Sequence, residues 1–324
     1  MILSFPSLLS ELIMQTQLAG LLSRQFEVKA MRKKINKYGY LFVLPFILSL
    51  IIFGIYPTIY TVVMSFQKWD GLSEAKWIEM ENYKRLFSDH VYVLSLWNTI
   101  RIWIIEFVPQ LIISLILSAW FSLRHMRGMS FFRAAFYLPN LLTAAAVGIL
   151  FSLLFKGNKS VANNIFVALH VPGAPFNFFQ NGIFVSNLAS YIQWWMWFGY
   201  TTIIIMAGIT AIDSSIYEAA QADGASRKQT YLYITLPLIK PTIIYIIVTS
   251  IIGGMQLFDV PSTLSNGTGD PDKAVLTTSM YLYNQGFKNR NFGYSAAVSV
   301  GLFGVIAAAS IISFAIMNRR NRET

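Results

Sequence analysis

The 324-residue sequence contains no cysteine, and only 12% of its residues are charged. Without cysteine the chain forms no disulfide, has no thiolate nucleophile and offers no thiolate ligand to a metal. A soluble domain usually carries about 25% charged residues. Half that share leaves too little polar surface to cover a water-soluble globule of this length, so the composition indicates an integral membrane protein.

Sequence signatures of nucleotide binding and catalysis are also absent. There is no Gly-Lys pair, and therefore no Walker-type phosphate loop, and no G-x-S-x-G elbow occurs. The histidines His90, His125 and His170 lack the spacing of a zinc site. The net charge of +10 does not require nucleic acid as a partner, because cationic loops set the topology of membrane proteins. We expect a transport component that is not an enzyme and has no metal or cofactor of its own.

Six long apolar segments are predicted to be transmembrane helices. Each is long enough for a helix to cross a hydrocarbon core of about 30 Å. Each must be helical, because lipid offers no partner to a free backbone group. The predicted fold class is therefore an all-α integral membrane protein with six transmembrane helices. The segments are 40–66, 99–123, 131–155, 186–212, 241–264 and 293–317.

The distribution of charge predicts the orientation of these helices. Acidic residues gather in one of the loops, whereas lysine and arginine are concentrated at 24–37, 124–133, 227–240 and 319–322. Since basic loops stay in the cytoplasm, we expect both termini and the loop 213–240 on that side. The loops expected outside are 67–98, which is rich in acids, 156–185 and 265–292.

Residues 1–30 fit this pattern poorly. The apolar stretch from Leu8 to Leu22 is interrupted by polar residues and is too short for a span, and no basic region precedes it as in a signal peptide. Met31 is followed by basic residues and then by the first span, like a natural beginning. We hypothesise that 1–30 is a dispensable or misassigned extension of a domain at 31–324. The alternative is a helix lying on the inner leaflet.

The loop at 213–241 carries the most specific pattern. Ser215 followed by Glu218 is typical of a capping box that opens a short helix. Gly224 is expected to end this helix, because glycine adopts the left-handed conformation without steric cost. Small residues on such an exposed helix allow another protein to approach closely.

A second amphipathic helix is predicted directly after this turn. Its apolar face would carry Tyr231, Ile234 and Leu236, and Pro237 and Pro241 would break it before the next span. The pattern alone is equally compatible with an interfacial connector that has no partner.

These residues resemble the EAA loop of permease subunits from binding-protein-dependent ABC importers, and the resemblance extends from about Met31 to the C-terminus. The loop motifs are Glu218-Ala219-Ala220, Asp223-Gly224-Ala225 and Ile234-x-Leu236-Pro237. Other segments are similar to carbohydrate permeases, in particular to the maltose-type first permease subunit. They are Asn82-Tyr83-x-x-Leu86-Phe87-x-Asp89, Asn98-Thr99, Tyr137-Leu138-Pro139, Gln256-x-Phe258-Asp259 and Tyr281-x-Tyr283-x-x-Gly286-Phe287. The large outer domain of that subunit is missing, so the chain resembles the compact multiple-sugar or glycerol-phosphate variety.

The resemblance implies a type I ABC importer permease in a bacterial plasma membrane. Its partners would be membrane lipid, a second permease subunit, an extracytoplasmic solute-binding protein and two ATPase subunits, which bind the ATP and Mg²⁺. ATP-driven closure of the ATPases would swing the spans from inward- to outward-facing. The residues that couple this chain to an ATPase would be Glu218, Ala219, Ala220, Asp223 and Gly224.

Polar groups inside predicted spans are candidates for the substrate pathway, because they are costly in lipid. Gln256 and Asp259 are three residues apart in the fifth span and are expected on one helix face. Glu106 lies about seven residues into the second span, and Gln193 precedes Trp194 in the fourth. Aromatic faces together with amides and carboxylates suit a sugar.

Each candidate also has a structural interpretation. Tryptophans near a span end are commonly interfacial, Glu106 could pair with Arg101, and Asp259 could serve helix packing. As a second function, a transporter or channel that works without ATP would require inverted repeats and an ion relay, and no repeat is evident. We therefore favour the ABC permease. We expect its substrate to be an oligosaccharide, and a neutral one, because the candidate groups are acidic or neutral.

Overall fold

The computed structural model describes residues 39–123 and 128–319 and divides into two units, 1–61 and 62–324. An apolar helix begins at Gly39 in the first unit and passes through a π-helical turn, η1 (Ile51–Ile55), into α2 (Tyr56–Met64), whose last three residues belong to the second unit. Its 26 residues make it about 39 Å long, enough to cross a membrane. The hypothesis about residues 1–30 falls outside the described ranges.

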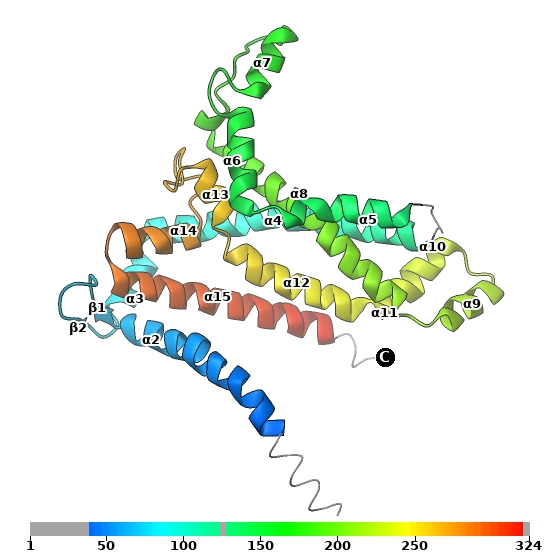
Figure 1. Cartoon of the computed structure of the whole chain (residues 1–324), viewed down its shortest axis with the longest axis horizontal. Helices are drawn as coiled ribbons and strands as arrows, with labels where there is room; N and C mark the ends of the chain where they lie inside the picture. Colours follow the sequence, from blue (N-terminus) through cyan, green and yellow to red (C-terminus); the bar gives the residue numbers. More distant parts are fainter. Residues whose placement is uncertain (1–38, 124–127, 320–324) are drawn as a thin grey trace, which may run out of the picture. The chain divides into compact units, whose positions relative to one another are not determined.

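In the second unit, four long helices pack against one another around α12. They are α4 (His90–Leu123), α8 (Gly182–Thr210), α12 (Lys240–Met255) and α15 (Phe292–Arg319). Figure 1 shows α12 lying along α15, with α4 and α8 on its other side. Hydroxyl side chains allow α4 and α8 to approach closely. Ser114 Oγ, for example, donates to the carbonyl oxygen of Phe198 at 2.9 Å.

Shorter elements connect the long helices. The sheet of the described residues is a two-residue antiparallel ladder, and the connecting helices are mostly shorter than three turns. These elements are β1 (Gln67–Lys68), β2 (Lys76–Trp77), α3 (Glu81–Ser88), α5 (Met129–Tyr137), η2 (Leu138–Leu141), α6 (Ala144–Phe155), α7 (Val161–Ala168), η3 (Phe178–Gln180), α9 (Ser214–Ala222), α10 (Arg227–Thr230), η4 (Tyr231–Thr235), α11 (Leu236–Leu238), α13 (Asp259–Leu264), α14 (Thr278–Tyr283) and η5 (Asn284–Lys288).

The all-α membrane architecture is confirmed. Four helices in the described ranges are long and apolar enough to cross a membrane, and there are six crossings when each of two bent helix pairs counts as one. The four helices are Gly39–Met64, His90–Ser122, Lys240–Leu264 and Phe292–Met317; the pairs are Met129–Leu141 with Ala144–Phe155, and Gly182–Thr210 with Ser214–Ala222.

The expectation of one continuous helix over 131–155 is wrong. The chain bends by 87° between η2 and α6. Pro139 lies in the short 3₁₀ segment, and Leu142 and Thr143 are extended. Thr143 then starts a new helix, because its hydroxyl accepts a hydrogen bond from the backbone N–H of Ala146 at 3.4 Å.

A hydrogen-bonded cluster fastens the start of α4 to α14 and α15. The Asp89 carboxylate accepts the backbone N–H of Val91 at 2.9 Å and the hydroxyl of Tyr294 at 2.6 Å, and it also accepts the hydroxyl of Tyr281. Burial acts to raise the pKa of Asp89, but the hydrogen bonds from both tyrosines and from the backbone N–H groups of Val91 and Tyr92 together outweigh it, and the pKa lies below its ordinary value. Asn98 adds bonds from its side-chain amide to the carbonyl oxygens of residues 273 and 276.

Candidate functional site: a membrane cavity and an inner loop

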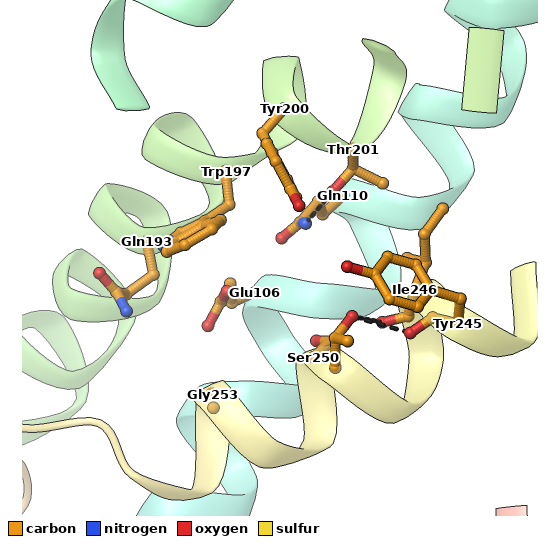
Figure 2. Close-up of a pocket in the computed structure, with 12 residues that line it drawn as sticks. Glu106, Gln110, Gln193, Trp197, Tyr200, Thr201, Tyr245, Ile246, Ser250 and Gly253 are labelled. Atoms are coloured by element: carbon orange, nitrogen blue, oxygen red, sulfur yellow. Dashed lines mark hydrogen bonds between the residues drawn. The ribbon is translucent and has the colours of Figure 1, made fainter. Parts of the chain in front are cut away.

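Three helices of the second unit enclose a cavity of about 240 Å³. Side chains from α4, α8 and α12 point into it (Figure 2). The lining combines aromatic rings, hydroxyls, side-chain amides and one carboxyl group. It consists of Glu106, Gln110, Gln193, Trp197, Tyr200, Thr201, Tyr245, Ile246, Thr249, Ser250, Gly253 and Gly254.

Helical periodicity explains why these residues meet. Glu106 and Gln110 are four residues apart on α4 and therefore share a face. On α8, Gln193 is followed by Trp197 after four residues and by Tyr200 and Thr201 about one turn later. On α12, pairs of neighbouring residues line the cavity at every fourth position, from 245 and 246 to 253 and 254. Each helix thus presents one polar stripe, and the three stripes converge on the cavity.

Three acceptor atoms around the cavity have no hydrogen-bond partner among the described residues. They are Oε2 of Glu106, Oε1 of Gln110 and Oε1 of Gln193, from side chains that are 5%, 4% and 8% exposed. The amide nitrogen of Gln110 donates to the Thr201 hydroxyl at 2.6 Å. Because an unpaired buried acceptor costs about 1–3 kcal/mol, the arrangement suits a ligand that brings its own donors.

Glu106 lies deeper than the sequence suggested. Helix α4 begins at His90, so Glu106 is about 24 Å along it, near the middle of the span rather than near its outer end. Arg101 does not serve as its ionic partner. It lines a separate open depression with Asn181 and Asp272.

The premise that placed Gln256 and Asp259 on one helix face is wrong. Helix α12 ends at Met255 and α13 starts at Asp259. Pro261 has no N–H for the carbonyl of Leu257, which instead accepts the Thr277 hydroxyl at 2.7 Å. Both Gln256 and Asp259 are exposed, and neither lines the cavity.

The aromatic candidate of the fourth span is displaced by one turn. Trp194 stacks on Phe198 with ring centroids 5.3 Å apart and does not line the cavity. Trp197 does, next to Gln193 (Figure 2). Sequence reasoning therefore found Glu106 and Gln193 of the lining but missed Gln110, whose four-residue spacing from Glu106 was the available signal.

A glycine brings α12 and α4 together at the cavity wall. A Cβ atom at Gly254 would collide with the indole ring of Trp103. That ring in turn donates its Nε1–H to the hydroxyl of Ser250 at 2.9 Å. The close approach of the two helices thus depends on the absence of a side chain at Gly254.

The loop at 213–241 begins with α9, but the cap of this helix differs from the prediction. Asp213 is the N-cap, and its carboxylate accepts the backbone N–H of Ser215 at 2.9 Å. This hydrogen bond lowers the pKa of Asp213. The predicted capping box of Ser215 and Glu218 is wrong, because Ser215 already lies inside the helix. A capping box occurs instead at the start of α10.

The predicted end of this helix is confirmed. Gly224 has φ +77°, and the backbone N–H of Ala225 donates to the carbonyl of Ala220 at 2.9 Å, which gives the turn expected at a glycine C-terminus. The predicted second helix is present as the run α10, η4 and α11. This run ends at Ile239. The backbone N–H of Ile239 makes the last hydrogen bond of the run, to the carbonyl oxygen of Thr235.

The loop is fastened to the bundle on one side and exposed on the other. The Tyr231 hydroxyl donates to the carbonyl of Leu115 on α4 at 2.9 Å. The hydroxyls of Tyr217 and Thr235 are 3.3 Å apart, and Ala220 is buried. The exposed candidates are Glu218, Ala219, Asp223 and Gly224. Figure 1 shows α9 and α10 at the end of this unit opposite to α3 and the β-ladder.

Membrane-length helices around a polar cavity, joined by an anchored loop, define a membrane transport subunit. Residues 93–323 match the family described as "Binding-protein-dependent transport system inner membrane component". The chain belongs to this family, and it is therefore a transport component of a membrane.

Relatives match along most of the chain. The lactose transport system permease protein LacF of Rhizobium radiobacter is 32% identical over 288 residues, covering 87% of this chain and 96% of the relative. The arabinooligosaccharides transport system permease protein AraP of Bacillus subtilis is 33% identical over 278 residues, covering 85% of this chain and 86% of the relative. A solved bacterial ABC transporter involved in alginate import has the same fold, with a TM-score of 0.72 at 21% identity over 88% of this chain and 96% of that one.

Proposed function

We propose that this chain is the permease subunit of an ATP-driven ABC importer that moves a carbohydrate, specifically an oligosaccharide, into a bacterial cell. The observation that carries the proposal is the cavity at mid-span, where aromatic rings and unpaired hydrogen-bonding atoms occur together. Sugars present apolar ring faces and hydroxyl donors, so they complement both kinds of group. The names of the relatives, lactose and arabinooligosaccharides transport permeases, support the same substrate class.

The assembly that we propose contains a second permease subunit, two ATPase subunits that bind ATP and Mg²⁺, and a solute-binding protein on the outer face. One solved alginate transporter is in complex with a periplasmic protein that carries an alginate pentasaccharide, which supports the last partner. Both termini and α9 are then cytoplasmic, and the domain extends over 31–324 with its coupling loop at 213–241.

In this proposal, the exposed side of α9 docks on an ATPase. Glu218 and Asp223 offer polar contacts, Ala219 permits a close fit, and Gly224 keeps the turn. Ala220 has a different role, because its side chain is buried and therefore not available for docking. The ATPase supplies the energy, and this chain transmits it.

The anchoring bonds connect the docking surface with the cavity. Tyr231 binds the carbonyl of Leu115, and Leu115 lies on the same helix as Gln110 and Glu106. A displacement of the loop therefore acts on a helix that lines the cavity. Gln256, Asp259 and Trp194 lie outside this cavity and remain predicted pathway residues for other stages of translocation.

The proposal is tested by Gly224→Asp in the assembled transporter. We expect normal insertion and assembly but loss of substrate-stimulated ATPase activity, because an aspartate strains the left-handed turn and adds bulk at the docking surface. Gly157→Asp is a matched control, since Gly157 also has a positive φ, +87°, and open space around it. Stimulated ATPase activity that persists in the Gly224 variant would refute the coupling role.

A further inference from the structure

Among the described residues, the cavity wall contains one buried carboxyl group and no positively charged side chain. Glu106 is the one carboxylic acid of this described lining, which includes no lysine, arginine or histidine. A buried carboxylate without a counter-charge is costly in a medium of low polarity. A positive charge on the ligand would supply the counter-charge for Glu106 that the described lining lacks.

We propose that Glu106 is a specificity-determining residue that makes the cavity favour saccharides with a protonated amino group over neutral ones, and neutral saccharides over acidic ones. This inference rests on the proposed function and adds the charge of the substrate to it. Family membership leaves the charge open, because the relatives and solved neighbours transport different sugars.

The hydrogen-bonding inventory around Glu106 points in the same direction. The fully buried atoms of Glu106, Gln110 and Gln193 that lack a partner among the described residues are all oxygens, and they act as acceptors when Glu106 is ionised. An ammonium group brings three donors, and a hydroxyl brings one. A carboxylate brings acceptors alone, so it would leave these oxygens unpaired and add two more.

The aromatic part of the lining also favours a cation. Figure 2 shows Glu106 between Gln193 of α8 and Ser250 of α12, with the ring of Trp197 close by. Tyr200 and Tyr245 contribute two further rings. Aromatic faces carry negative potential and attract ammonium groups, whereas they offer nothing to an anion.

The test uses three monosaccharides: glucose, and two sugars that each differ from glucose in one substituent. These are glucosamine, which has an amino group, and glucuronate, which has a carboxylate. Binding to the assembled transporter in lipid nanodiscs, without the solute-binding protein, is measured by saturation-transfer NMR, which detects weak complexes. The variants are Glu106→Gln, which keeps the shape and removes the charge, and Glu74→Gln, which makes the same change in an exposed outer loop. Gel filtration confirms that each variant assembles.

For the native chain and the Glu74 control, we expect glucosamine to bind best and glucuronate worst, with at least roughly a tenfold difference between them. Glu106→Gln should reduce this difference to about twofold or less. Equal binding of the three sugars by the native chain, or an unchanged order in Glu106→Gln, would overturn the charge preference and leave the carbohydrate cavity standing. Binding of none of the three would contradict the cavity's proposed function as well.

Discussion

Replacing Gly254 by alanine tests the helix contact that forms the cavity wall. The new methyl group would stand about where the indole of Trp103 now lies, with the Cγ atom 2.7 Å and the Nε1 atom 2.8 Å from it. Overpacking of this kind costs about 1–3 kcal/mol. Displacement of the indole also breaks its hydrogen bond to Ser250, worth about 0.5–1.5 kcal/mol.

Gly253→Ala is the matched control for stability, because a Cβ atom there meets nothing within 4 Å. Both substitutions gain the same helix propensity. The difference in stability between the two variants therefore measures the clash with Trp103. We expect Gly254→Ala to be less stable than Gly253→Ala by about 2–4 kcal/mol, seen as a thermal midpoint several degrees lower for the purified transporter in detergent. Equal midpoints would refute the close packing of α12 on α4.

Three further predictions concern hydrogen bonds outside the cavity. Asp89→Asn should lower the thermal midpoint at neutral pH, because the carboxylate that accepts Tyr281 and Tyr294 is lost. Since the pKa of Asp89 is lowered by folding, its contribution to stability is present above the unfolded value of about 3.9 and disappears as the pH falls through the folded pKa. A midpoint difference between native chain and variant that does not shrink as the pH is lowered below the unfolded value would contradict this. Tyr231→Phe removes the bond to the Leu115 carbonyl and should reduce transport per ATP hydrolysed while preserving assembly, and unchanged stoichiometry would exclude this bond from coupling. Ser226→Ala removes the capping box of α10 and should destabilise the loop by about 1 kcal/mol, detected as faster amide exchange there, whereas unchanged exchange would show that the cap is dispensable.

Local signals in the sequence were sufficient where the backbone conformation depends on nearby residues. Gly224 is an example, because the left-handed turn needs only the glycine itself and the helix before it. The apolar segments likewise predicted the membrane architecture, since the length of a span is set by the bilayer. The capping box predicted at Ser215 was wrong by two residues, because Asp213, just before the expected helix start, is the N-cap instead.

The remaining features depend on contacts that a linear pattern does not contain. The break at Gln256 is completed by the Thr277 hydroxyl, which binds the carbonyl left free before Pro261. The apolar residues on both sides of this break outweigh Gln256 and Asp259, so the segment resembled one helix. Convergence of Gln110 and Tyr245 on Glu106 required the packing of three helices, although the four-residue spacing on α4 was visible.

The central claim, that the exposed side of α9 contacts an ATPase, is open to a direct measurement. The chain contains no cysteine, so a single cysteine at Ala219 needs no other change. In inside-out membrane vesicles that contain the whole transporter, a bifunctional reagent should join Ala219→Cys to the ATPase subunit. The same reagent should leave Glu74→Cys, in the outer loop, without such a product. An Ala219→Cys chain that reacts only with lipid, or only with reagents supplied from outside the cell, would contradict the claim.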